Sequence, residues 1–124
     1  MYYQNSWIKN SEGYTALHYA SCKGNIQIAK FLIENGATVE ATTNRGIKVI
    51  HFSAVSNQPS IMVYFIHYQA QDVFLMDECG SIPLYWGCYS WAEETLSFLL
   101  SLKVIIDGKD KEGYTPLHLS VQAV

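Results

Sequence analysis

One motif recurs along the chain at an almost constant interval, and this period limits the possible fold more than any other feature. The motif reads SEGYTALHYAS, NRGIKVIHFSA, ECGSIPLYWGC and KEGYTPLHLSV in its four copies. Its glycines, Gly13, Gly46, Gly80 and Gly113, are 33, 34 and 33 residues apart. A fixed period of this length indicates a repeat architecture, in which each unit buries its apolar face against its neighbours.

A second apolar block follows each of the first three motifs and predicts a second helix in each unit. Its apolar residues recur at positions i, i+3 and i+4, which places them on one helical face. We expect that face to be a buried seam in all three units: Ile28, Phe31 and Leu32; Ile61, Tyr64 and Phe65; Thr95, Phe98 and Leu99. The spacing of 34 predicts one extra residue between Gln69 and Val73, in the loop after the second helix of unit two.

The strings GYTALHYAS and GYTPLHLSV resemble the ankyrin repeat, whose signature is G-x-T-P-L-H-x-A. The resemblance implies an all-α fold, an ankyrin-repeat solenoid of helix-turn-helix units with finger-like turns. It predicts an N-terminal tail (1–9) and a repeat domain (10–124), with three full repeats at about 10–42, 43–76 and 77–109 and a truncated fourth at 110–124. Unit two departs most from the signature, with Asn57 in place of Gly24, and we expect it to be less regular and less stable.

The histidines favour a structural role over a metal site. His18, His51 and His118 occupy the motif position at which a ring can hydrogen-bond to the backbone of the adjoining turn and tie units together. His67 falls late in a second helix, without Cys, Asp or Glu at metal-ligand spacing. We therefore expect no metal and no cofactor.

Composition and motifs exclude several other functions. The net charge is -3 and no basic stripe is present, so nucleic acid is not an expected partner. No string typical of a nucleophile, a phosphate loop or a dinucleotide site occurs, and we expect a chain that is not itself an enzyme. No apolar run reaches about 18 residues, which predicts no direct membrane insertion. Three cysteines, an odd number, favour reduced thiols and a cytoplasmic location.

The ankyrin resemblance implies that the chain binds other proteins or extended peptides on a concave face built from turn tips and first helices. The implied partner-binding residues are Glu12, Tyr14, Tyr19, Lys23, Arg45, Ile47, Ser56, Ser81, Trp86, Tyr89, Ser90, Glu112 and Tyr114. An aromatic row follows the motif histidine, with Tyr19, Phe52, Trp86 and Leu119. A core role is favoured for Phe52 and Leu119, and both interpretations stay open for Trp86.

PLYWGCYS, followed by a leucine-rich helix, also resembles the ankyrin region of Asp-His-His-Cys (DHHC) palmitoyltransferases. Tyr85 and Gly87 depart from the usual His and Ala of that region. The alternative function is therefore a fragment of a membrane S-palmitoyltransferase, whose repeats recruit a proline-containing client segment over Trp86. Such a chain would lie at the cytoplasmic face of a membrane.

The last motif ends at Val124 after a single predicted helix. Leu117 and Val121 would then lack the partner that covers their counterparts, so we expect either a fragment or self-association through this uncovered repeat. At the other end, Trp7 and Ile8 are expected to lie over the outer face of unit one.

Overall fold

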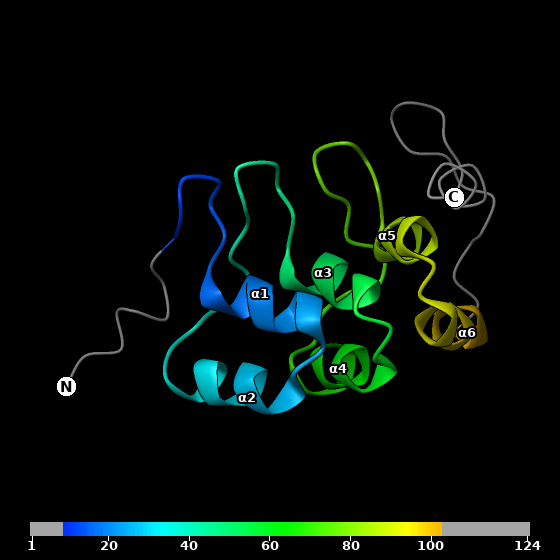
Figure 1. Cartoon of the computed structure of the whole chain (residues 1–124), viewed down its shortest axis with the longest axis horizontal. Helices are drawn as coiled ribbons and strands as arrows, with labels where there is room; N and C mark the ends of the chain where they lie inside the picture. The colour runs from blue at the N-terminus through cyan, green and yellow to red at the C-terminus, as the bar shows by residue number, and fades with distance from the viewer. Residues whose placement is uncertain (1–8, 103–124) are drawn as a thin grey trace.

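The computed structural model describes residues 9–102, which form three helix pairs and no strand within that range. The elements in chain order are α1 (Ala16–Lys23), α2 (Ile26–Glu34), α3 (Val49–Val55), α4 (Pro59–Val63), the π-helix η2 (Tyr64–Tyr68), α5 (Pro83–Ser90) and α6 (Glu93–Ser101). The first helices α1, α3 and α5 pack in one layer, the second helices form another, and a finger-like loop precedes each first helix (Figure 1). This arrangement confirms the predicted all-α stack of helix-turn-helix units. The expected fourth repeat and the expected cap of Trp7 and Ile8 lie outside the described residues.

The three first helices begin at the same position of the motif, directly after Thr15, Lys48 and Ile82. Thr15 precedes α1, and its side chain accepts a hydrogen bond from the backbone N–H of His18, while the Thr15 backbone N–H donates to His18 Nδ1 over 2.9 Å. These reciprocal bonds satisfy two donors that a helix N-terminus otherwise leaves without partners. Helix α5 instead starts with Pro83, whose ring suits the first helical position because no N–H is needed there.

The motif histidines join each first helix to the segment that leads into the next finger. His18 Nε2 lies 3.1 Å from the Ala41 carbonyl oxygen, and His51 Nε2 lies 2.8 Å from that of Leu75. Because each Nδ1 accepts a backbone N–H, the ring proton belongs on Nε2, which donates to these carbonyls. The predicted tie between units is confirmed for both histidines.

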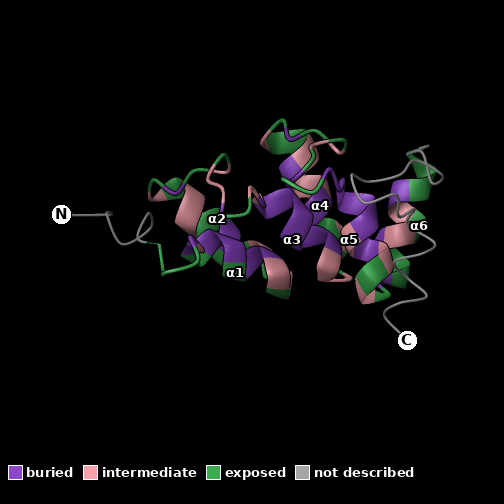
Figure 2. Ribbon diagram, turned by 90° about the horizontal axis from the view of Figure 1, so that it is seen from above, coloured by how far each residue is buried: buried purple, intermediate pink, exposed green. Residues whose placement is uncertain are grey.

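The core runs along the middle of the stack. Buried residues are concentrated in α3, which lies between α1 and α5 (Figure 2). Leu17, Ile50 and Leu84, which share one motif position, are all fully or almost fully buried. At the small-residue position, a Cβ on Gly87 would lie 3.2 Å from Leu96 Cδ2, so the lack of a side chain lets α5 and α6 approach closely.

The predicted buried seam is wrong for unit one. Ile61 and Thr95 are fully buried, whereas Ile28 and Phe31 are 47% and 60% exposed. Thr95 lies beside the preceding unit, since its backbone N–H approaches Asn57 Oδ1 at 3.4 Å. Unit one has no preceding unit among the described residues, so the same positions of α2 remain on the surface.

The extra residue of unit two widens a helix rather than lengthening the loop after it. In unit one the Ala37 N–H donates to the Leu32 carbonyl over 2.9 Å, and in unit two the Gln71 N–H donates to the matching carbonyl of Phe65 over 3.0 Å. The insertion therefore lies between Phe65 and Gln71, where η2 forms a wide turn. A π turn includes one more residue than an α turn, which corrects the prediction of an insertion between Gln69 and Val73.

Three different residues adopt the same left-handed conformation between paired helices. Gly24, Asn57 and Trp91 have φ angles of 72°, 56° and 61°. Asn tolerates this conformation better than most residues. Asn57 also links units two and three, because its Oδ1 accepts the Glu94 N–H over 2.8 Å at the start of α6, which has no side-chain cap from Ala92.

We expect Asn57→Ala to lower the free energy of unfolding by about 1–2 kcal/mol, because it removes both the cap of α6 and the residue suited to left-handed backbone. Asn57→Gly keeps the backbone freedom and removes only the cap, so its loss should be smaller. Urea unfolding monitored by circular dichroism would measure both. Wild-type stability in Asn57→Gly would show that the cap contributes nothing.

Candidate functional site

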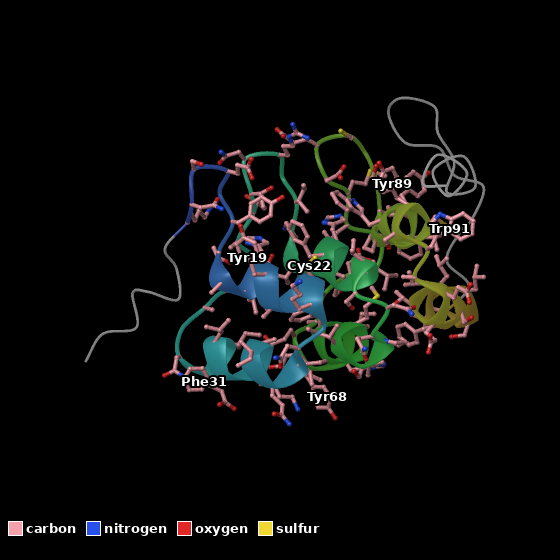
Figure 3. The ribbon with its side chains drawn as sticks, in the orientation of Figure 1. Tyr19, Cys22, Phe31, Tyr68, Tyr89 and Trp91 are labelled. Atoms are coloured by element: carbon pink, nitrogen blue, oxygen red, sulfur yellow. The ribbon has the colours of Figure 1, made fainter. Side chains whose placement is uncertain are left out.

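The candidate site is the face formed by the fingers (residues 10–14, 43–47 and 77–81) and the first helices, called here the finger-side face. Tyr19 and Tyr89 lie on this side, whereas Phe31 and Tyr68 project from the second helices on the opposite side (Figure 3). Both tyrosines of the finger-side face are about half exposed, at 52% for Tyr19 and 55% for Tyr89. The face therefore presents large aromatic side chains to solvent.

Backbone hydrogen bonds hold the fingers in fixed register. The Asn44 N–H donates to the Glu12 carbonyl over 3.0 Å, and the Glu78 N–H donates to the Arg45 carbonyl over 3.2 Å. The Asn44 side chain adds a bond to the Ser11 carbonyl at 2.9 Å. Glu12, Arg45 and Glu78 are exposed, so consecutive finger tips carry acidic, basic and acidic side chains in order.

Aromatic rings form a continuous row across the three first helices. The Tyr14 centroid lies 5.3 Å from those of Tyr19 and Phe52, and Phe52 lies 5.9 Å from Trp86. These are the separations of interacting aromatic pairs. Phe52 is 6% exposed, which confirms its predicted core role, while Trp86 is partly buried and contributes both to packing and to the surface.

Sequence reasoning missed the residues that begin the fingers, Asn10, Thr43 and Asp77. In each of these residues, one side-chain oxygen accepts the backbone N–H groups of the residues two and four positions later. The donor–acceptor distances are 2.9–3.0 Å for Asn10, 3.2–3.3 Å for Thr43 and 2.9 Å for Asp77. This pattern is an Asx or ST turn, which these short polar side chains favour. The signal was available, because the three positions follow the same period as the glycines.

The predicted partner-binding residues divide according to their exposure. Glu12, Tyr19, Lys23, Arg45 and Tyr89 are exposed; Tyr14, Ser56, Trp86 and Ser90 are partly exposed; and Glu112 and Tyr114 lie outside the described residues.

Ile47 and Ser81 are buried, at 6% and 8% exposure, and the structure corrects their assignment to the binding surface. Their backbone N–H groups are bonded to Thr43 and Asp77 inside the fingers. An apolar side chain such as Ile47 is more stable away from water at this position, whereas the matching Tyr14 stays partly exposed.

Burial favours the neutral forms of two histidines and one cysteine near this face. Burial lowers the pKa of His18 and of His51, so both rings favour the uncharged state. Burial also raises the pKa of the Cys88 thiol to about 11, which suppresses the reactive thiolate.

Across residues 9–102, no cluster of three His, Cys, Asp or Glu side chains could hold a metal ion. The helices of this same stretch are all too short or too polar to cross a membrane.

Comparison with known families identifies the repeating unit. The family model described as ankyrin repeat matches residues 12–44, which contain the first finger, α1, α2 and the start of the second finger. This unit is an ankyrin repeat. The other two helix pairs of the described ankyrin stack follow at the periods of the sequence motif.

Several longer proteins match nearly all of this ankyrin-repeat chain. Palmitoyltransferase AKR1 of Lachancea kluyveri is 29% identical over 84% of the chain, and palmitoyltransferase AKR1 of Saccharomyces cerevisiae is 31% identical over 88%. The human transient receptor potential cation channel subfamily A member 1 is 28% identical over 90%. The chain spans only 14%, 19% and 10% of the lengths of these three relatives.

The names of these relatives point to a shared scaffold rather than a shared reaction. A transferase and a cation channel have unrelated chemistry, so a stretch common to both does not by itself specify either activity. Ankyrin repeats bind other proteins, and a stack of such units provides an extended surface for this purpose.

We expect the free energy of unfolding to decrease as the pH falls from 7.5 to 5.5. Above pH 6.5, the ordinary value for His, the histidines are neutral in both states. Below pH 6.5 the histidines bind protons in the unfolded chain, whereas the lowered pKa values of His18 and His51 keep both rings neutral in the folded chain. This difference favours unfolding by about 1.4 kcal/mol per unit of pKa difference. Urea midpoints across this range measure the effect. The exposed His67 provides a control, since His67→Gln should retain the decrease, and a flat profile in the wild type would contradict the expectation.

Proposed function

We propose that this chain is a protein-binding module whose finger-side face holds an extended segment of a partner protein. The observation that supports this most directly is the row of Tyr19, Tyr14, Phe52 and Trp86, which crosses three units and remains partly exposed. Tyr and Trp supply a large contact area at low entropic cost and dominate the energetics of protein interfaces. Tyr89, exposed on α5, extends the aromatic surface at the far end.

An extended peptide suits this face better than a small molecule. The row follows the stack from α1 to α5, so a ligand must be long to contact all of it. The finger tips carry Glu12, Arg45 and Glu78 along one edge, and their alternating charge would favour a peptide whose own charges alternate in the complementary order. The thiol of Cys88 is held protonated, so this group does not suggest covalent chemistry on the face.

A second candidate function is favoured by the relatives named palmitoyltransferase AKR1. In that case the chain would be the substrate-recruiting part of a membrane S-palmitoyltransferase, and the peptide would be a proline-containing segment of a cytoplasmic client near Trp86. The resemblance of PLYWGCYS to the ankyrin region of DHHC enzymes supports the same alternative. Continuation of the genomic reading frame into four hydrophobic spans and a cysteine-rich loop would separate it from a stand-alone adaptor. Both candidates place the binding event in the cytoplasm.

We expect peptides selected from a displayed random library on the wild-type chain to bind less tightly to Tyr19→Ala and Tyr89→Ala, by about 1–3 kcal/mol for each hot-spot side chain. Isothermal titration calorimetry would measure the affinities, after circular dichroism has shown that each variant is folded.

Tyr68→Ala is the matched control, because Tyr68 is 76% exposed but lies on η2, on the opposite side of the stack. Its affinity should equal that of the wild type. If Tyr68→Ala weakens binding while Tyr19→Ala and Tyr89→Ala do not, the peptide binds the second-helix side and the proposal is wrong.

A further inference from the structure

The residue that begins each finger is matched to the aromatic residue nine positions later. The pairs are Asn10 with Tyr19, Thr43 with Phe52, and Asp77 with Trp86. In unit one, Asn10 Nδ2 donates to Tyr19 Oη over 3.0 Å, and in unit three, Trp86 Nε1 donates to Asp77 Oδ2 over 3.0 Å.

The hydrogen-bonding capacity of the two members agrees in every pair. Trp has only a donor and faces Asp, which has only acceptors. At the equivalent positions of unit two, Phe52 has no side-chain polar atom, and the single hydroxyl of Thr43 already serves the finger turn. Asn10 uses Oδ1 for two backbone N–H groups, which orients its amide so that Nδ2 points to Tyr19. The first residue of a finger therefore has a side-chain polar atom outside the finger turn only in units one and three. In these two units the aromatic residue has a polar group that can hydrogen-bond to that atom.

We propose that Asn10 and Asp77 are positioning residues, which fix the orientation and the available hydrogen-bonding groups of Tyr19 and Trp86 on the finger-side face. This inference rests on the proposed function of that face. It has a chemical consequence for the partner. The Trp86 N–H is occupied by Asp77, so Trp86 offers a ligand only the apolar part of its ring.

Tyr19 differs, because its oxygen accepts from Asn10 and its own O–H remains able to donate. The 52% exposure of Tyr19 leaves that donor accessible to a ligand. The partner segment should thus place a hydrogen-bond acceptor, such as a backbone carbonyl, at Tyr19 and an apolar side chain at Trp86.

Solvent exchange of the Trp86 indole N–H tests the positioning without any ligand. Its NMR signal can be assigned with Trp86→Phe. In Asp77→Asn the side-chain oxygen can still serve the finger turn, but the amide N–H₂ opposes the indole N–H, so exchange should accelerate by roughly tenfold, the factor for a lost hydrogen bond of about 1.4 kcal/mol. Exchange at the wild-type rate would overturn the role of Asp77.

Rebuilding the unit-one pair in unit three provides a second test. Asp77→Asn combined with Trp86→Tyr recreates the pair of Asn10 and Tyr19, so its urea midpoint should exceed that of Asp77→Asn alone. A double variant no more stable than Asp77→Asn would show that the pairs are not matched. This test remains informative if Asp77→Asn is only marginally folded.

Asn10→Asp tests the role of Tyr19 with little change in packing. The carboxylate can keep the finger turn, but Tyr19 must then donate its O–H to the second oxygen and loses its donor for a ligand. The urea midpoint should stay near the wild-type value, while affinity for peptides selected on the wild-type chain should fall by about tenfold, as it should for Tyr19→Phe. Wild-type affinity in both variants would overturn the donor role.

The outcomes separate this inference from the proposed function. If the selection yields no peptide, the proposed function and the donor role of Tyr19 both fail, while indole exchange and the rebuilt pair still decide whether the fingers position the rings. If peptides bind but exchange is unchanged in Asp77→Asn, the proposed function stands and the positioning role of Asp77 is rejected.

Discussion

The stack depends on a buried neutral histidine that bonds both to the start of its own helix and to the segment leading into the next finger. In units one and two, His18 and His51 accept a backbone N–H at the start of their own helix and donate to a carbonyl that leads into the next finger. Each ring bonds one backbone N–H and one backbone carbonyl, and its own nitrogens, which are buried, would otherwise lack partners at a cost of about 1–3 kcal/mol per group. Burial lowers the histidine pKa and keeps the ring in the form able to do both. Together with the backbone bonds between fingers, this bond fixes the register of the stack.

From that register comes the surface that we propose for binding. Because the fingers are tied to the helices and to one another, the aromatic rings behind them fall at nearly equal separations from Tyr14 to Trp86. The same rings also pack the interior, since Phe52 is buried between its two partly exposed neighbours. Packing and recognition therefore share one row of side chains, so the variants that test binding must also be tested for folding.

Comparison of equivalent positions shows how the units compensate for departures from the ankyrin signature. Asn57 occupies a glycine position and uses its side chain to begin a helix in the next unit. The insertion in unit two is taken into the wide turn η2, so that Gln71 returns to the register of Ala37. In both cases a local irregularity is balanced by a hydrogen bond, and the helix pairs keep their spacing.

The sequence by itself determined the period, the helix pairs and the bonding role of the histidines, because these depend on local hydrogen-bonding capacity and on spacing along the chain. Only the tertiary structure decided which equivalent residues are buried. Ile28 and Ile61 occupy the same helical position, but only Ile61 has a preceding unit to cover it. The pairing of Asp77 with Trp86 likewise depends on where the finger folds back onto α5, a contact across space that hydrophobic periodicity does not encode.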